Sequence, residues 1–368
     1  MNLDFLQHKL DERVQKGNVR SLPKNSNLLD FLSNDYLGLS RNQELANAIH
    51  DRCRTEEVPN GGTGSRLLSG NHQWYEEAEE LLKQVFQAES ILLFNSGYAA
   101  NQALVSAIAD RGDTILYDQL AHVCLKEGAW LSKAETVAFR HNDLNDLESR
   151  LTRSKGRCFV LTETVFSMDG DMAPLVEMVE LCEKYEAYLI VDEAHSTGVY
   201  GEGGSGLLAQ MGLEDRVFAR VYTFGKGMGV HGACVAGLQT LKNYLVNFGR
   251  PFIYTTSLPP HSVIAITESF KYLNENLVLQ NQLKDKIIAF RSLWEDSLSQ
   301  TSIQPIMIGD NEKARQVSLE LQKSGFDVRP ILSPTVKSGT ERLRISLHVH
   351  NSDEEIEKLV SVLTSQIS

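Results

Sequence analysis

The chain has 368 residues, which is too long for one compact core, so we expect a main domain together with a smaller one. Its formal net charge is −12, from 36 basic and 48 acidic residues, and an acidic chain without a basic stripe argues against nucleic acid or an anionic membrane as main partner. No apolar run approaches the roughly 20 residues of a membrane span, and the N-terminus lacks the basic and apolar regions of a signal peptide. Since the five cysteines are also widely scattered, we expect a cytoplasmic protein.

The first part of the chain combines a polar start with a long alternating region. Residues 1–30 are polar, and we expect an arm with one short helix. Short β-rich runs then alternate with helical patterns, and strands are expected at 90–94, 114–117, 135–139, 158–162 and 188–191. This alternation predicts an α/β fold with a mostly parallel, doubly wound sheet.

The character of the sequence changes after Leu258-Pro259-Pro260. Helical patterns run from about 262 to 298, and a smaller α+β unit follows, with strands at 303–308 and 342–349. The last helix opens with a capping box from Ser352 to Glu355. We therefore predict an N-terminal arm at 1–40, a large domain at 41–260, and a connecting helix with a small C-terminal domain at 261–368. His348 and His350 share a face of a strand, and without a third ligand we interpret them as surface residues and predict no metal site.

Lys226 is the most informative single residue. It lies between Gly225 and Gly227, directly after the apolar run 217–222, and so at the end of a probable strand. Asp192 ends another apolar run and lies 34 residues earlier, about one βαβ unit. A carboxylate and a lysine at the ends of two such strands indicate a cofactor site.

Two nucleotide-binding interpretations fit parts of the sequence and fail on others. Asp192-Glu193-Ala194-His195 matches a helicase ATPase motif, but no G-x-x-x-x-G-K-[ST] loop accompanies it. Gly227 to Gly232 form a G-x-G-x-x-G, but no Asp or Glu occurs between Asp215 and Glu268 to hold a ribose. Both interpretations are therefore discounted.

Pyridoxal phosphate accounts for more of the polar residues, with Lys226 as its Schiff-base lysine. Its ring nitrogen must stay protonated, so a carboxylate has to face it, and Asp192 suits that role. The phosphate needs the N–H groups of a helix N-terminus, which 95–98 offer between a strand and a helix. His122 is a flat partner for the ring, and His195 could reach the phenolate oxygen. Ser167 and Thr223 are further polar contacts near strand ends.

The ordered motifs resemble the α-oxoamine synthase family of fold-type-I pyridoxal phosphate enzymes. The resemblance runs from about Ser33 to Arg344. It rests on the motifs Ser33-Asn34-Asp35-Tyr36-Leu37-Gly38-Leu39, Gly64-Ser65-Arg66 through Ser69-Gly70, Ser96-Gly97-Tyr98-Ala99-Ala100-Asn101, Thr162-Glu163 with 166–171, Asp192-Glu193-Ala194-His195-Ser196-Thr197-Gly198, Thr223-Phe224-Gly225-Lys226-Gly227, 254–260, and Pro334-Thr335-Val336 with Arg342-Leu343-Arg344.

The Asp-Glu-Ala-His-x-Thr-Gly form favours the biotin-pathway branch of that family. The resemblance then implies a decarboxylating condensation of L-alanine with pimeloyl-CoA or a pimeloyl-carrier protein. Gly64-Ser65-Arg66-Leu67-Leu68 resembles the serine-using branch equally well. A related synthase that uses glycine or serine with another acyl-CoA therefore remains open. A binding or regulatory protein on a catalytically dead scaffold is a further alternative, and the intact set of Lys226, Asp192 and His195 argues against it.

The resemblance also assigns roles to individual residues. It implies catalytic roles for Lys226, His122 and Asp192. The implied cofactor contacts are Lys226, Gly97, Tyr98, His122, Glu163, Ser167, Asp192, His195, Thr223 and Thr255. The implied substrate contacts are Arg20, Asn34, His122, Thr335 and Arg344, with Arg344 as the clamp for the amino-acid carboxylate. It further implies a homodimer in which Thr255 or Thr256 reaches the neighbour's phosphate.

Overall fold

The computed structural model describes residues 3–15, 19–20, 22 and 27–367. The chain divides into two compact units. The larger unit comprises Asn34–Asp285 and His348–His350, and the smaller comprises Met1–Ser33, Lys286–Leu347 and Asn351–Ser368. This division differs from the predicted boundaries, because the N-terminal arm groups with the C-terminal part and the helix after Pro259 belongs to the larger unit.

A seven-stranded sheet forms the centre of the larger unit, with strand order β2-β8-β7-β6-β5-β3-β4. Its strands are β2 (Ser90–Phe94), β3 (Thr114–Asp118), β4 (Glu135–Phe139), β5 (Cys158–Glu163), β6 (Tyr188–Asp192), β7 (Ala219–Thr223) and β8 (Ala233–Gly237). Strands β3 to β7 are parallel, whereas β8 is antiparallel to both of its neighbours, β2 and β7. The predicted α/β class with a mostly parallel sheet is confirmed, and the antiparallel β8 was not predicted.

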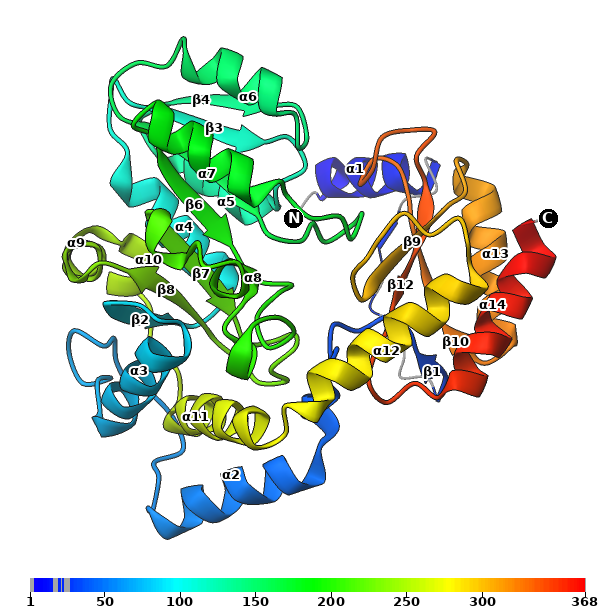
Figure 1. Cartoon of the computed structure of the whole chain (residues 1–368), viewed down its shortest axis with the longest axis horizontal. Coiled ribbons are helices and arrows are strands. Elements are labelled where there is room, and N and C mark those ends of the chain that lie inside the picture. The colour runs from blue at the N-terminus through cyan, green and yellow to red at the C-terminus, as the bar shows by residue number, and fades with distance from the viewer. Residues whose placement is uncertain (1–2, 16–18, 21, 23–26, 368) are drawn as a thin grey trace. The chain divides into compact units, whose positions relative to one another are not determined.

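Helices cover both faces of this sheet (Figure 1). Because side chains alternate along a strand, Ile190 packs on one face while Leu189 and Val191 pack on the other. One face is covered by α4 (Gly97–Ile108), α5 (Val123–Leu131), α9 (Gln239–Phe248) and α10 (Arg250–Ile253), and the other by α6 (Leu144–Leu151), α7 (Leu175–Lys184) and α8 (Leu207–Gln210). The strands are therefore buried on both sides and present only their ends to a ligand.

Further helices of the larger unit cover the sheet near β2 and β7, since the helix that ends at Val85 contacts β2 and the Phe86 ring directly after it stacks on Tyr222 of β7. Helix α11 (Pro260–Glu275) packs against α2 (Gln43–Thr55) and α3 (Gln73–Val85). Three short 3₁₀ turns occur at Leu39–Arg41, Glu202–Gly204 and Glu214–Arg216.

His348 is fully buried and its ring stacks on that of His350, with 4.6 Å between centroids, so the interpretation of His348 as a surface residue was wrong.

The smaller unit is built on a three-stranded antiparallel sheet with the order β11-β12-β9. Its strands are β9 (Ile303–Met307), β11 (Arg329–Ile331) and β12 (Arg342–Ser346), and β1 (Leu29–Asp30) pairs separately with β10 (Phe326–Asp327). Its helices are α1 (Asp4–Gln15), α13 (Asn311–Lys323) and α14 (Asp353–Ile367), while α12 (Val278–Leu293) contains the division between the units. The predicted capping box is present, because Glu355 N donates to Ser352 Oγ and Ser352 N to Glu355 Oε2. Among the described residues, none of the helices is long and apolar enough to cross a bilayer.

Candidate active site

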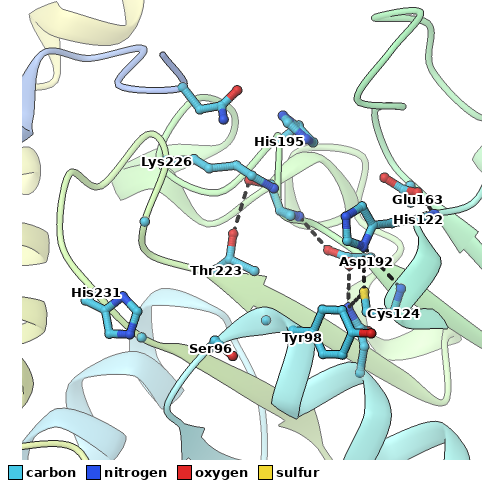
Figure 2. Close-up of a pocket in the computed structure, with 16 residues that line it drawn as sticks. Ser96, Tyr98, His122, Cys124, Glu163, Asp192, His195, Thr223, Lys226 and His231 are labelled. Atoms are coloured by element: carbon cyan, nitrogen blue, oxygen red, sulfur yellow. Dashed lines mark hydrogen bonds between the residues drawn. The ribbon is translucent and has the colours of Figure 1, made fainter. Parts of the chain in front are cut away.

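A cavity of about 260 Å³ opens at the carboxyl ends of the parallel strands of the larger unit (Figure 2). Glu163, Asp192 and Thr223 are the last residues of β5, β6 and β7, and all three line it. This edge of an open α/β sheet is the usual place for a ligand, since helix N-termini and strand ends converge there. The cavity is lined by Asn34, Ser96, Gly97, Tyr98, Asn101, His122, Cys124, Glu163, Asp192, Ala194, His195, Thr223, Gly225, Lys226, His231 and Gly232.

Lys226 lies on the turn between β7 and β8. A backbone hydrogen bond from Phe224 N to Gly232 O joins the two ends of the turn, and one from Gly229 N to Lys226 O lies within it, each 2.9 Å long. A Cβ on Gly227 would lie 2.6 Å from Thr197 O, and one on Gly229 would lie 2.3 Å from Ser40 N. The glycines around the lysine therefore permit close backbone packing, which explains why they imitate a dinucleotide motif without its acidic partner.

Asp192 is buried, and its carboxylate is held by two donors. Asn101 Nδ2 donates to Asp192 Oδ2 at 2.6 Å, and Ala194 N donates to Oδ1 at 2.8 Å. The amide of Asn101 therefore fixes the direction in which the carboxylate faces the cavity.

His122 caps the N-terminus of α5. Its Nδ1 accepts from Cys124 N at 3.3 Å and lies 2.9 Å from Cys124 Sγ, so the ring proton belongs on Nε2. Burial lowers the pKa of this imidazole, and Lys226 lowers it further against the opposing effect of Asp192. His122 is therefore a neutral, flat ring at neutral pH.

Glu163 binds the backbone N–H of the same histidine. Its Oε1 accepts from His122 N at 2.5 Å. Burial raises the pKa of Glu163 well above its usual range, and the charge of Asp192 raises it further. Glu163 can therefore carry a proton near neutral pH, when most exposed glutamates are ionised.

His195 and Asn34 are joined through the buried phenol of Tyr36. The Tyr36 hydroxyl donates to Asn34 Oδ1 at 3.1 Å and lies 2.7 Å from His195 Nδ1. Both residues line the cavity, so Tyr36 couples their positions.

Helix α4 presents its N-terminus to the cavity. Ser96 is the N-cap and its Oγ accepts from Ala99 N at 3.2 Å. A Cβ on Gly97 would lie 2.4 Å from Thr223 Cγ2, so only glycine lets this turn approach the end of β7. The first N–H groups of the helix lack intrahelical acceptors and favour an anion there.

Some predicted residues lie outside this cavity. Ser167 is on the loop between β5 and α7, and Thr255 lines a smaller neighbouring pocket in which Asn95 Nδ2 donates to Thr255 Oγ1 at 3.3 Å. Three predicted substrate contacts belong to the smaller unit: Arg20 and Thr335 are exposed, and Arg344 is buried on β12. Arg344 Nη1 donates to Ser346 Oγ at 2.9 Å. The roles of these residues stay predictions.

Three cavity residues with hydrogen-bonding side chains had no predicted role. Asn101 and Cys124 connect Asp192 to His122, since Asn101 Nδ2 also donates to Cys124 Sγ at 3.3 Å. His231 lines the cavity from the turn that carries Lys226. One available signal was that Asn101 comes four residues after Gly97, and hence on the same side of α4, among apolar neighbours.

The donor set of the cavity fits pyridoxal phosphate. A helix N-terminus with no room for a Cβ at Gly97 suits a phosphate, and the amide-held carboxylate of Asp192 suits a protonated ring nitrogen. The neutral ring of His122 suits the face of the cofactor, and Lys226 supplies the amine. Figure 2 shows His122, Asp192 and Lys226 around one space.

Comparisons with known proteins agree with this fit. Residues 26–363 match the family of class I and II aminotransferases. The chain is 38% identical to an 8-amino-7-oxononanoate synthase of Methylobacillus flagellatus, over 98% of this chain and 95% of the relative.

Solved structures show the same architecture. The chain superposes on a serine palmitoyltransferase from S. paucimobilis, solved with pyridoxal phosphate and myriocin, with a TM-score of 0.90, 26% identity and coverage of 100% and 98% of the two chains. It also superposes on an 8-amino-7-oxononanoate synthase from Francisella tularensis, with a TM-score of 0.79, 27% identity and coverage of 93% and 98%.

Proposed function

Because the chain belongs to the class I and II aminotransferase family, we propose that it is a pyridoxal phosphate-dependent acyltransferase of biotin biosynthesis. In the proposed reaction, L-alanine condenses with a pimeloyl thioester to give 8-amino-7-oxononanoate, carbon dioxide and a free thiol. The observation that carries the chemistry is that Lys226 and Asp192 face one cavity at the ends of neighbouring strands. The identity to 8-amino-7-oxononanoate synthases supports the choice of substrates.

When bound, pyridoxal phosphate supplies an electron sink for the carbanion that forms at the amino-acid Cα. Asp192 would keep a proton on the ring nitrogen, and the hydrogen bond from Asn101 Nδ2 holds the Asp192 carboxylate in place for that role. Lys226 holds the cofactor and removes the Cα proton at Nζ. The neutral ring of His122 lines the cavity and would cover one face of the bound cofactor against water.

The remaining roles follow the family pattern. Gly97, Tyr98 and Thr223 line the cavity at the N-terminus of α4, which would hold the phosphate, and His195 would contact the phenolate side of the ring. Arg344 and Asn34 bind the amino-acid carboxylate, and Thr335 and Arg20 contact the acyl substrate. We also propose a cytoplasmic homodimer in which Thr255 of one protomer contacts the phosphate bound by the other.

A second candidate is the condensation of serine with palmitoyl-CoA, which the likeness to serine palmitoyltransferases favours. A panel of alanine, glycine and serine against pimeloyl-CoA, a pimeloyl-carrier protein and palmitoyl-CoA, read out as thiol release, separates the two. Alanine with a pimeloyl donor is expected to give the highest kcat/KM, by tenfold or more. Faster release with serine and palmitoyl-CoA would reject the biotin-pathway assignment in favour of the second candidate.

A further inference from the structure

A cluster of ionisable side chains lies beside the cavity without lining it. His141 follows β4, Asp118 ends β3, and Asp171 belongs to the loop between β5 and α7. His141 Nδ1 is 2.9 Å from Asp118 Oδ1, and His141 Nε2 is 2.7 Å from Asp171 Oδ2. Because a carboxylate only accepts hydrogen bonds, both ring nitrogens must carry protons, and the ring is an imidazolium.

The electrostatics agree with that protonation state. Burial opposes the charge on His141, but the hydrogen bonds and charges of Asp118 and Asp171 outweigh it and raise the pKa of His141 to about 10. Lys126 and Glu163 are further titratable groups at this turn; Lys126 Nζ donates to Gln119 O at 2.6 Å, and Glu163 accepts from His122 N. His141 therefore stays charged throughout the physiological range.

Asp118 connects this histidine to the turn that carries His122. Asp118 is fully buried, and its Oδ1 accepts from Leu120 N at 2.8 Å as well as from His141. Ala121 N donates to Asp118 O at 2.9 Å, and the next residue is His122, whose N is bound by Glu163. The turn from 118 to 122 is thus held at its start by the cluster and at its end by Glu163.

Asp171 connects the histidine to a loop that begins beside Asp192. Asn142 Nδ2 donates to Asp171 Oδ2 at 2.8 Å, and Phe166 N donates to Asp171 O at 3.0 Å. The Phe166 ring meets the His141 ring edge-on, with 4.4 Å between centroids. The loop begins at Thr164, whose N donates to Asp192 O at 3.0 Å.

A charged bridge of this kind is a poor device for stability alone, because desolvating three charges offsets much of their attraction. Its directional bonds instead fix the relative position of two segments. We propose that His141 is a positioning residue that bridges the turn before His122 and the loop beside Asp192, and so sets where the two groups on the cofactor ring lie. This inference rests on the proposed pyridoxal phosphate site.

The test compares His141→Gln with a matched control, Arg157→Gln. Arg157 pairs with the largely buried Asp113, with 2.6 Å between Nη2 and Oδ2. The two residues directly precede β5 and β3, so they lie at the amino ends of these strands, away from the cavity. Both variants remove one cation, His141 from two carboxylates and Arg157 from one, so both are expected to lower Tm. Only His141→Gln is expected to raise the Kd of the apoprotein for pyridoxal phosphate, by tenfold or more, and to change the visible circular dichroism of the bound cofactor.

Two results would overturn the proposal. If His141→Gln binds pyridoxal phosphate within twofold of wild type with the same dichroism band, or if Arg157→Gln shows the same losses, the cluster is structural only. If His141→Gln does not fold, Asp171→Asn decides by the same two measurements, with a threefold or greater rise in Kd supporting the bridge and an unchanged Kd rejecting it. A wild-type apoprotein that binds no pyridoxal phosphate would overturn the proposed function and this inference together.

Discussion

Lys226 differs from an ordinary surface lysine in sharing its cavity with two buried carboxyl groups, Asp192 and Glu163. If Lys226 holds the cofactor and moves the Cα proton, Lys226→Ala removes both functions at once. We expect loss of the yellow absorbance band and a fall in kcat of at least about a thousandfold, while Tm stays within a few degrees. The exposed Lys133→Ala is the control and should keep both colour and rate. A yellow, active Lys226→Ala protein would contradict the assignment.

His141 also predicts how stability depends on pH. Its folded pKa of about 10 lies above the ordinary value of 6.5, so its contribution is fully present below about pH 6.5 and is lost as pH rises through about 10. Wild type should exceed His141→Gln in free energy of unfolding by roughly 2–4 kcal/mol at pH 6, and this gap should shrink towards pH 10. Urea unfolding of both proteins across this range measures the gap. A gap that stays constant with pH would contradict the charged state.

At the residue scale, the sequence predicted those side chains whose position follows from a strand end. Asp192 and Thr223 end strands, and this placement can be read along the chain, whereas Glu163 was identified only through the family resemblance. Asn101 and Cys124 could not be predicted in this way. Their function depends on contacts between elements, since the bond from Asn101 to Asp192 joins residues 91 positions apart. No local pattern encodes such a contact.

Among the elements, strand β8 was not predicted from the sequence, whereas strands β5 and β6 were. Strands β5 and β6 are continuous apolar runs, which a sheet buried on both faces requires. Strand β8 has the sequence Ala-Cys-Val-Ala-Gly, whose small residues have weak strand preference, and it follows a glycine-rich turn. Its position is decided by close packing between β2 and β7, a tertiary effect that outweighs local propensity.

The turn that carries Lys226 gives a prediction at the same scale. Gly229 has φ of +64°, and a Cβ there would lie 2.3 Å from the backbone N of Ser40. Gly229→Ala should therefore cost about 3 kcal/mol or more and weaken cofactor binding, because the turn has to move. Gly212 has a similar φ of +67° but open space around it, so Gly212→Ala isolates the backbone cost of about 1 kcal/mol. Equal losses of Tm in the two variants would contradict the packing argument.

At the scale of the whole molecule, the exposed apolar side chains of the larger unit support the proposed homodimer. Leu68 is 84% exposed and Tyr254 is 78% exposed, and each lies within two residues of a group lining the small pocket that contains Thr255. Apolar residues this exposed are common where a partner subunit covers them.

Replacement of Tyr254 tests that assembly. Tyr254→Asp should place a charge in the interface, convert the dimer to monomer in light scattering, and lower the cofactor affinity together with kcat. Leu238→Asp is the control, because Leu238 is 59% exposed at the far end of β8. A Tyr254→Asp protein that remains dimeric and active would place the interface elsewhere.

The order of strands in the large sheet has a consequence for how the protein is made. Strand β2 lies at the sheet edge and pairs only with β8, although the two are separated by more than half of the larger unit. A ribosome must therefore release residues 233–237 before β2 can join the sheet and before the α4 N-terminus can settle against the end of β7. The phosphate side of the site is thus completed after its lysine has been synthesised, so a nascent chain cannot retain the cofactor until its larger unit has closed.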